Sequence, residues 1–247
     1  MLRFTDSHCH LDFDAFTNEL AQLLEQCQQA KIHRIIIPSI GPKNWHKALT
    51  LAKNHSTEAL NLQPCLGIHP WFLDDLTTDS FDTLAQLVQQ QINNIVAIGE
   101  AGIDGVIDKE QQNLSLQIEV FEQQLSLAKN YNLPIIVHHR RSHQHIVPML
   151  RKKNLLKGGI IHAFSGSYQQ AVQYIDLGFK LGIGGTITYP RAPAMPLYGF
   201  QGQNNSPLQL IKVFQALTSI RSESATELAH ALENNINAVL PTPRAPE

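Results

Sequence analysis

His8 and His10 are the first residues of the chain whose types and spacing suggest chemistry. They belong to the run Thr5-Asp6-Ser7-His8-Cys9-His10, which we interpret as a short strand. Side chains two positions apart on a strand share a face, so the two imidazoles would point the same way. Such a pair can hold a divalent metal ion, but it can also be an ordinary polar strand end. The rest of the chain has to decide between these interpretations.

Other histidines and one glutamate follow later apolar runs in the same manner. These residues are His69 after residues 62–68, Glu100 after residues 95–99, His138 after residues 133–137 and His162 after residues 159–161. If the runs are parallel strands, their carboxyl ends meet on one face and bring these side chains together. A single strand-end histidine is more often a structural residue than a ligand. The convergence of several with a carboxylate is typical of a site for Zn, Mn or a similar ion.

Glu100 is the one carboxylate that we place at the centre of this cluster. A central carboxylate can bridge two metal ions. Two ions lower the pKa of bound water and hold a phosphoryl or acyl oxygen, which is hydrolytic chemistry. We therefore predict a metal-dependent hydrolase.

Arginines and aromatic residues occur in the loops that follow these strands. They are Arg140, Arg141, Arg191, Trp71, Phe72, Phe164, Tyr189, Tyr198 and Phe200. One guanidinium group can bind two phosphate oxygens at once, and aromatic rings can stack on nucleic-acid bases. The alternative is a set of solvated arginines and rim aromatics, which we expect for most of the aromatic residues.

The elements that must position these residues alternate between strand and helix patterns. We expect strands over residues 5–10, 32–40, 62–69, 95–100, 133–138, 159–162 and 179–183. The clearest amphipathic helix between them has apolar residues at 114, 118, 121, 125 and 128. This alternation predicts an α/β protein with a parallel sheet, and a (β/α) barrel rather than an open sheet. An open sheet usually has a glycine-rich phosphate turn after its first strand, where this chain has Ser7 to His10.

The composition fits one domain, which we place at residues 1–240, with a disordered tail at residues 241–247. The chain has 247 residues, 43% of them hydrophobic, and a formal net charge of −2. This charge gives no general attraction for nucleic acid, so a phosphate-bearing partner would need a local site. The three cysteines form no CxxC pair, and no segment resembles a signal peptide or a membrane span. We expect a cytoplasmic monomer without a membrane partner.

Five ordered motifs resemble the TatD family of metal-dependent hydrolases, within the amidohydrolase-like barrels. They are Asp6-Ser7-His8-Cys9-His10, Gly67-Ile68-His69-Pro70, Gly99-Glu100-Ala101-Gly102-Ile103-Asp104, His138-His139-Arg140 and His162-Ala163-Phe164-Ser165-Gly166. The resemblance implies a (β/α)8 TIM-type barrel. It also implies DNase activity, often as a 3′–5′ exonuclease, with two divalent ions such as Zn, Mn or Mg.

The resemblance also assigns individual residues. The metal ligands that it implies are His8, His10, Glu100, His138 and His162, and the substrate-side residues are His69, Asp104, Arg140 and Arg191. His139 stands where the family usually has serine. The substrate is expected to be DNA or another phosphodiester or ester. Short or single-stranded ends are favoured because the arginines are few and local.

One expected motif is missing from this chain. The family has a further helix, an eighth strand and a Thr-Asp-Ala-Pro motif, whose aspartate is a ligand and the expected water-orienting base. This chain has no such motif and no aspartate after Asp176, so the catalytic base stays unassigned. The missing helix and strand amount to about 15–25 residues. Either the printed sequence leaves out a segment next to Pro193, or the barrel is open. Losing a core strand would be costly against a total stability of about 5–15 kcal/mol, which favours an omission.

Two other functions stay open at this point. The first is an amidohydrolase-like esterase or deacylase, for example on mischarged tRNA. Many two-metal relatives of that kind use a carbamoylated lysine where this chain has Glu100, which makes this alternative weaker. The second is a catalytically impaired relative that binds metal and DNA.

Overall fold

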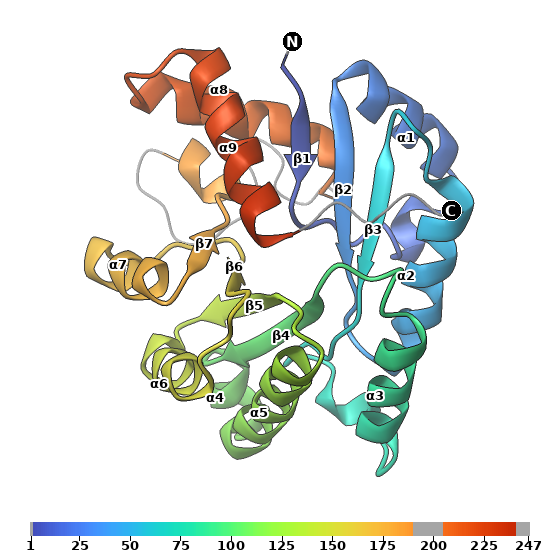
Figure 1. Cartoon of the computed structure of the whole chain (residues 1–247), viewed down its shortest axis with the longest axis vertical. Coiled ribbons are helices and arrows are strands. Elements are labelled where there is room, and N and C mark those ends of the chain that lie inside the picture. The colour runs from blue at the N-terminus through green and yellow to red at the C-terminus, as the bar shows by residue number, and fades with distance from the viewer. Residues whose placement is uncertain (1, 190–204, 241–247) are drawn as a thin grey trace.

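The computed structural model describes residues 2–189 and 205–240, in which seven parallel strands alternate with helices (Figure 1). The strands are β1 (Phe4–Asp6), β2 (Ile32–Pro38), β3 (Asn61–Cys65), β4 (Ile98–Asp104), β5 (Ile135–Arg140), β6 (Gly159–Ile161) and β7 (Phe179–Leu181). The α-helices are α1 (Leu20–Gln29), α2 (Pro42–His55), α3 (Ser80–Gln90), α4 (Ile107–Gln111), α5 (Leu114–Asn130), α6 (His143–Lys153), α7 (Tyr168–Asp176), α8 (Leu210–Ile220) and α9 (Ala225–Val239). None of these helices is long and apolar enough to cross a membrane.

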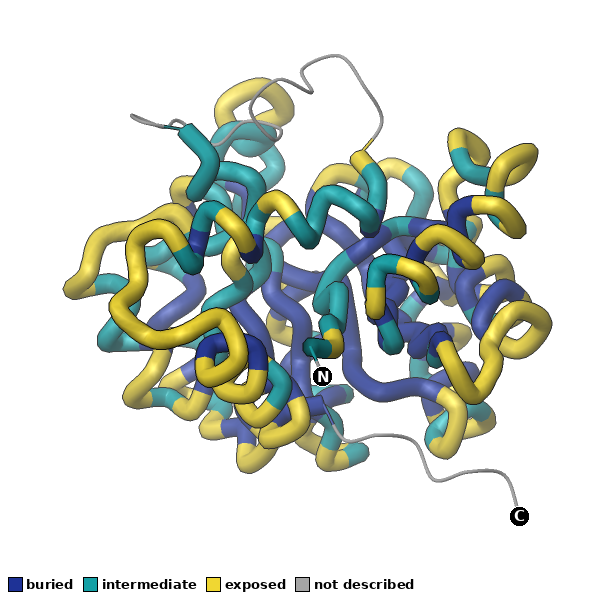
Figure 2. The backbone as a smooth tube through the Cα atoms, turned by 90° about the horizontal axis from the view of Figure 1, so that it is seen from above, coloured by how far each residue is buried: buried dark blue, intermediate teal, exposed yellow. Residues whose placement is uncertain are grey.

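The strands follow one another around the sheet in chain order. The first three form one parallel sheet and the last four another, and a parallel bridge between Leu66 and Ile98 joins β3 to β4. Helices surround the strands, and the buried segments gather at the centre of the molecule (Figure 2). The α/β fold with a parallel sheet is therefore confirmed.

The helices form where the sequence patterns predict them. On α5, Phe121, Leu125 and Ala128 are buried against the sheet, as their spacing requires. Helices α7 and α9 begin with capping boxes, in which Ser167 pairs with Gln170 and Ser224 pairs with Glu227. Each box satisfies two backbone N–H groups that a helix start leaves without partners.

Several strand boundaries differ from the prediction; for example, β3 ends at Cys65, so that His69 lies in the loop beyond it, and the largest differences for the site are in β1 and β4. Strand β1 ends at Asp6, so His8 and His10 lie in the loop beyond it. Strand β4 begins at Ile98 and continues to Asp104, although Gly99 and Gly102 interrupt its apolar pattern. Pairing with β5 extends β4, because every residue of β4 is buried between neighbours and needs partners for its backbone groups.

The sheet stays open between β7 and β1. No strand follows β7 within residues 2–189 and 205–240, and α8 and α9 follow instead. The described part of the chain therefore has the arrangement of a barrel with seven of the eight strands of the family fold. The tail at residues 241–247 lies outside the described residues.

Candidate active site

Glu100 lies between two pairs of imidazoles. It is on β4, its side chain is 2% exposed, and its backbone N–H donates to the Ser39 carbonyl at 2.9 Å. Each of its two carboxylate oxygens faces a different pair. Oε2 faces His8 and His10, and Oε1 faces His69 and His138.

The first pair consists of His8 and His10, in the loop after β1. Their Nε2 atoms lie 2.9 and 3.3 Å from Glu100 Oε2 and 3.2 Å from each other. The Nδ1 atom of His10 donates to the Pro38 carbonyl at 3.0 Å, so Nε2 can accept or ligate whenever the ring is neutral. Both imidazoles therefore point toward the same carboxylate oxygen, although they do so from a loop and not from the predicted strand.

The second pair consists of His138, on β5, and His69, after β3. Their ring nitrogens lie 3.0 and 3.6 Å from Glu100 Oε1, and 3.2 Å separates His69 Nε2 from His138 Nδ1. The backbone N–H of Trp71 donates to His69 Nδ1 at 3.1 Å. Burial lowers the pKa of His69 to about 4, so the ring is neutral near pH 7 and carries its proton on Nε2. His69 therefore presents an N–H donor to the site.

Asp104, at the end of β4, lies behind His138 and is fully buried. Its Oδ2 atom lies 2.9 Å from His138 Nε2 and accepts from the Trp71 indole N–H at 2.7 Å. Its Oδ1 atom accepts from the backbone N–H groups of Val106 and Ile107. Both oxygens are engaged, so contact with a substrate would require breaking one of these bonds.

His162, which follows β6, stacks on His8 with 3.4 Å between the ring centroids and 15° between the planes. Burial, reinforced by the nearby His8, holds the pKa of His162 well below its ordinary value, so the ring is neutral. It lines the same cavity as Glu100. The structure thus brings all five residues predicted as metal ligands to one place.

The charges of the cluster favour a cation. Burial opposes ionisation of Glu100, but the surrounding histidines outweigh it and hold the pKa of Glu100 well below its ordinary value. Burial likewise opposes charge on His138, but Asp104 and Glu100 raise its pKa to about 9. Burial opposes charge on His10 as well, but Glu100 raises the pKa of this ring too. In the metal-free chain a proton on His138 therefore supplies positive charge beside these carboxylates.

The donor set fits divalent metal ions. Two groups, His8 with His10 and Glu100, and His69 with Glu100 and His138, each have one ligand atom per residue within 4.8 Å of the others. In a tetrahedral site with bonds of about 2.1 Å, ligand atoms lie about 3.4 Å apart, close to the distances of the first group. His8 also has a buried Nδ1 atom without a hydrogen-bond partner. In the second group, His69 Nε2 carries a proton and cannot bind a metal ion. His69 could serve as a ligand there only if the proton moved to Nδ1.

Close backbone contact holds Glu100 in position. A Cβ atom on Gly67 would lie 2.6 Å from two backbone atoms of Gly99, the residue before Glu100. Trp45 of α2 donates its indole N–H to the Gly67 carbonyl at 2.7 Å. A side chain at Gly67 would therefore displace the strand that carries Glu100.

Two buried glutamines of α5 bind the backbone at the end of β4 and in the loop after β3. The Gln117 amide bonds both the N–H and the carbonyl of Asp104, at 2.7 and 3.2 Å. The Gln124 amide bonds both backbone groups of Ile68, at 2.8 and 3.0 Å. We did not predict these residues from the sequence. The available signal was the polar type of Gln117 and Gln124 on the apolar face of the helix.

A cavity of about 660 Å³ opens above the cluster. Phe13, Trp71, Phe72 and Arg140 line it together with the metal-site histidines. The Arg140 side chain is 40% exposed, with Nη1 3.8 Å from Asp104 Oδ2.

Phe164 is another residue predicted for the rim. Phe164 packs against His139 and Tyr174 instead. Arg191, Tyr198 and Phe200 lie outside the described residues.

A parallel α/β fold with imidazole pairs around one buried carboxylate at its strand ends defines a class, the metal-dependent hydrolases with TIM-type barrels. A family model described as TatD related DNase matches residues 5–196. The chain belongs to this TatD family of metal-dependent hydrolases.

Relatives support this assignment. The chain is 38% identical to the uncharacterized metal-dependent hydrolase YjjV of Escherichia coli, over 98% of this chain and 99% of the relative. The crystal structure of YjjV matches with a TM-score of 0.91 over 98% of this chain and 99% of that chain. An uncharacterized metal-dependent hydrolase of Haemophilus influenzae is 34% identical, over 91% of this chain and 94% of the relative. A 3′–5′ ssDNA/RNA exonuclease TatD of Pantoea ananatis is 24% identical, over 94% of this chain and 90% of the relative.

The alignment with YjjV also bears on the length of the chain. It runs over 262 positions, whereas the chain has 247 residues, so at least 15 of the aligned positions have no counterpart here. In size, this shortfall falls in the range of about 15–25 residues that a helix and a strand occupy.

Proposed function

We propose that the chain hydrolyses phosphodiester bonds at the ends of single-stranded DNA, as a TatD-type deoxyribonuclease. The observation that carries the proposal is the position of Glu100 between two imidazole pairs at the floor of an open cavity. Two divalent ions in this cluster would supply an activated water and hold phosphoryl oxygens. The name of the Pantoea ananatis relative, a 3′–5′ ssDNA/RNA exonuclease, agrees in reaction type.

The chain's own residues have distinct roles in this proposal. His8, His10, Glu100, His138 and His162 would hold the ions. His10 is oriented for this by Pro38, and His138 by Asp104. Asp104 is then a positioning residue, because it acts on the site through the His138 ring.

The substrate side of the cavity offers three groups. The Arg140 guanidinium can bind phosphate oxygens in pairs, as its partial exposure allows. The Trp71 side chain is 45% exposed and can stack on a terminal base. The Nε2–H group of His69 can donate to an oxygen next to the cleaved bond.

The test incubates an end-labelled single-stranded oligonucleotide with the protein. The protein is first stripped of metal and then reloaded with Mn²⁺. We expect stepwise shortening from the 3′ end, which chelation stops and which Glu100→Gln abolishes. Glu110→Gln, at an exposed position of α4, is the matched control and should cleave normally. Cleavage that persists in Glu100→Gln or in excess chelator would contradict the proposal.

A metal-dependent DNA-binding protein without turnover is the second candidate. One observation supports this second candidate. Within the described residues, Glu100 is the one carboxylate in both candidate metal groups, and no other carboxylate is identified as a catalytic base. Mn²⁺-dependent binding of the oligonucleotide without shortening would support it. Hydrolysis of p-nitrophenyl esters without attack on DNA would instead favour an esterase or deacylase.

A further inference from the structure

Strands β1 and β7 each have one edge without a partner strand. Within residues 2–189 and 205–240, β1 pairs with β2 and β7 pairs with β6, and neither pairs with another strand. Helix α9 contacts both strands and lies across the gap between them (Figure 1). Each open edge presents a row of backbone N–H and carbonyl groups, which is a template for a further strand.

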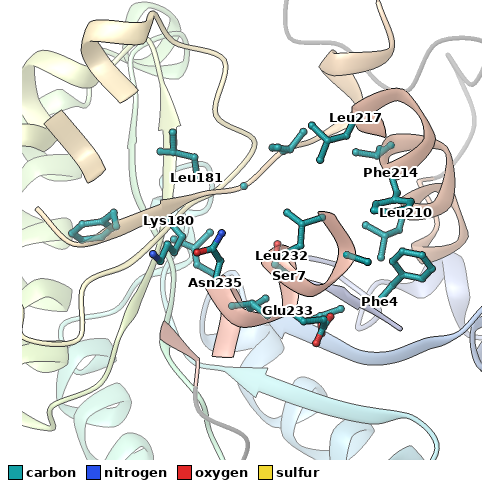
Figure 3. A pocket seen from close by; sticks show the side chains of 18 of the residues that line it. Phe4, Ser7, Lys180, Leu181, Leu210, Phe214, Leu217, Leu232, Glu233 and Asn235 are labelled. Carbon is teal, nitrogen blue, oxygen red and sulfur yellow. The ribbon is translucent and has the colours of Figure 1, made fainter. Parts of the chain in front are cut away.

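The gap between the two edges is a cavity of about 610 Å³, and we call it the β1–β7 slot. The side chains of Phe4, Leu181, Leu210, Phe214, Leu217 and Leu232 line it (Figure 3). They come from both strands and from α8 and α9. Much of the lining of the slot is therefore apolar, while its two sides are strand edges.

This combination favours a polypeptide strand over other occupants. A strand of a parallel sheet is buried on both faces, and it satisfies the backbone groups of both neighbours. A small amphiphile could cover the apolar walls but would leave the strand edges unpaired. Within residues 2–189 and 205–240, a second copy offers no free strand, because every strand of that part is already paired in a sheet.

Charge in the slot indicates what the ends of the strand should carry. Three cations, Arg3, Lys180 and Arg221, line the slot, against one acid, Glu233. Glu233 already binds His33 at 3.0 Å, and Arg221 already pairs with Glu223. Lys180 has no ion-pair partner among the described residues. An acidic residue at an end of the strand would therefore meet a favourable potential.

From these observations we propose that the β1–β7 slot binds an extended apolar polypeptide segment with acidic ends, as a strand parallel to β1 and β7. The strands beside the slot have three residues each, so a segment of about three to six residues is long enough to pair with both. The shortfall of at least 15 positions against YjjV is large enough to include such a strand. The proposal concerns binding alone and does not depend on the metal site.

The probe is a fluorescent synthetic peptide rich in valine and isoleucine, with glutamate at each end and both termini blocked. Its comparison peptide has the same side chains but is N-methylated at alternate residues, which removes the donors from one edge. We expect saturable binding of the first peptide by fluorescence anisotropy, and at least tenfold weaker binding of the second. Hydrogen exchange should slow at the amides of β1 and β7 when the first peptide is bound.

A substitution in the slot supplies the second test. Leu232→Lys places a charge on the wall of the slot at a position that is 37% exposed, so the fold should tolerate it. We expect it to weaken peptide binding at least tenfold. Leu156→Lys, at a position 90% exposed between α6 and β6, is the matched control and should bind as the unaltered chain does.

Three results would overturn the proposal. Equal binding of the two peptides would show that the strand edges take no part. Unchanged binding in Leu232→Lys would place the peptide elsewhere. Saturable binding of decanoate, without binding of the first peptide, would make the slot an amphiphile site instead.

Discussion

Asp104 Oδ2 lies 2.9 Å from His138 Nε2, on the side of the imidazole opposite Glu100. The ring of His138 is thus held between two carboxylates, and a hydrogen bond to Asp104 directs Nδ1 toward the candidate metal group. Burial opposes ionisation of Asp104, but hydrogen bonds from His138 and Trp71 hold its pKa well below the ordinary value. Asp104 is therefore an anion near pH 7.

Replacing Asp104 by asparagine should reverse the tautomer of His138. The asparagine oxygen would stay with the backbone N–H groups of Val106 and Ile107, and its NH₂ group would face the His138 ring. His138 would then carry its proton on Nδ1, where it blocks metal binding. We expect Zn²⁺ affinity to fall about 10–100-fold, measured by competition with a chromogenic chelator.

The control for this substitution is Asp176→Asn, at an exposed position of α7. It removes the same charge far from the metal cluster and should leave Zn²⁺ affinity unchanged. Equal affinities of Asp104→Asn and Asp176→Asn would show that His138 is oriented without Asp104.

The contact between Gly67 and Gly99 predicts a second effect. Gly67→Ala would place a methyl group 2.6 Å from the Gly99 backbone, which has to move and shift Glu100 with it. We expect the free energy of unfolding to fall by about 1–3 kcal/mol and Zn²⁺ affinity to fall with it. Urea unfolding and the chelator competition measure the two effects. Gly41→Ala, where nothing lies within 4 Å of the new methyl group, should change neither.

Much of the candidate site could be predicted because it depends on residue type and on position along a strand. His8, His10, Glu100 and His138 follow apolar runs, and parallel strands bring the ends of such runs together. Contacts that depend on the register between elements could not be predicted. For example, the loop after β3 determines that the Trp71 N–H donates to Nδ1 of His69 and not to Nε2. The spacing of residues in the sequence does not predict this choice.

The fold shows the same division. The order of strands and helices follows from the alternating patterns, and the sequence also indicates that a strand is missing after β7. The sequence does not determine where β4 begins and ends, because a glycine within a strand pattern can also indicate that the strand stops or bends there. The size and lining of the β1–β7 slot depend on how α8 and α9 pack, which the sequence patterns do not determine.

Gln124 supplies a third prediction, which concerns stability. In Gln124→Leu the backbone N–H and carbonyl of Ile68 would lose their partners while staying buried. We expect the free energy of unfolding to fall by about 2–4 kcal/mol in urea titrations, since an unsatisfied buried group costs about 1–3 kcal/mol. Gln123→Leu, whose amide makes an exposed hydrogen bond to Glu119, should cost less than about 0.5 kcal/mol. A similar loss in both variants would mean that the amide of Gln124 is not needed.

The last prediction concerns pH. Burial, reinforced by His143 and His138, lowers the pKa of His139 to about 4, and neither of its ring nitrogens has a partner. In the unfolded chain the pKa of histidine is about 6.5, so between about pH 6.5 and pH 4 the unfolded state binds a proton that the folded state does not. The neutral His139 ring therefore makes its full contribution to the free energy of unfolding above about pH 6.5. This contribution decreases as the pH is lowered from about 6.5 to 4.

His139→Gln removes this contribution and therefore isolates it. From pH 7 to pH 5 in chelator, we expect the unaltered chain to lose about 1–2 kcal/mol more stability than His139→Gln. Urea unfolding at the two pH values measures the difference, and titrating groups that do not interact with His139 cancel in the comparison. His55→Gln, at an exposed position of α2, should behave as the unaltered chain. If His139→Gln loses as much stability as the unaltered chain, His139 accepts a proton in the folded state, and its burial does not keep it neutral.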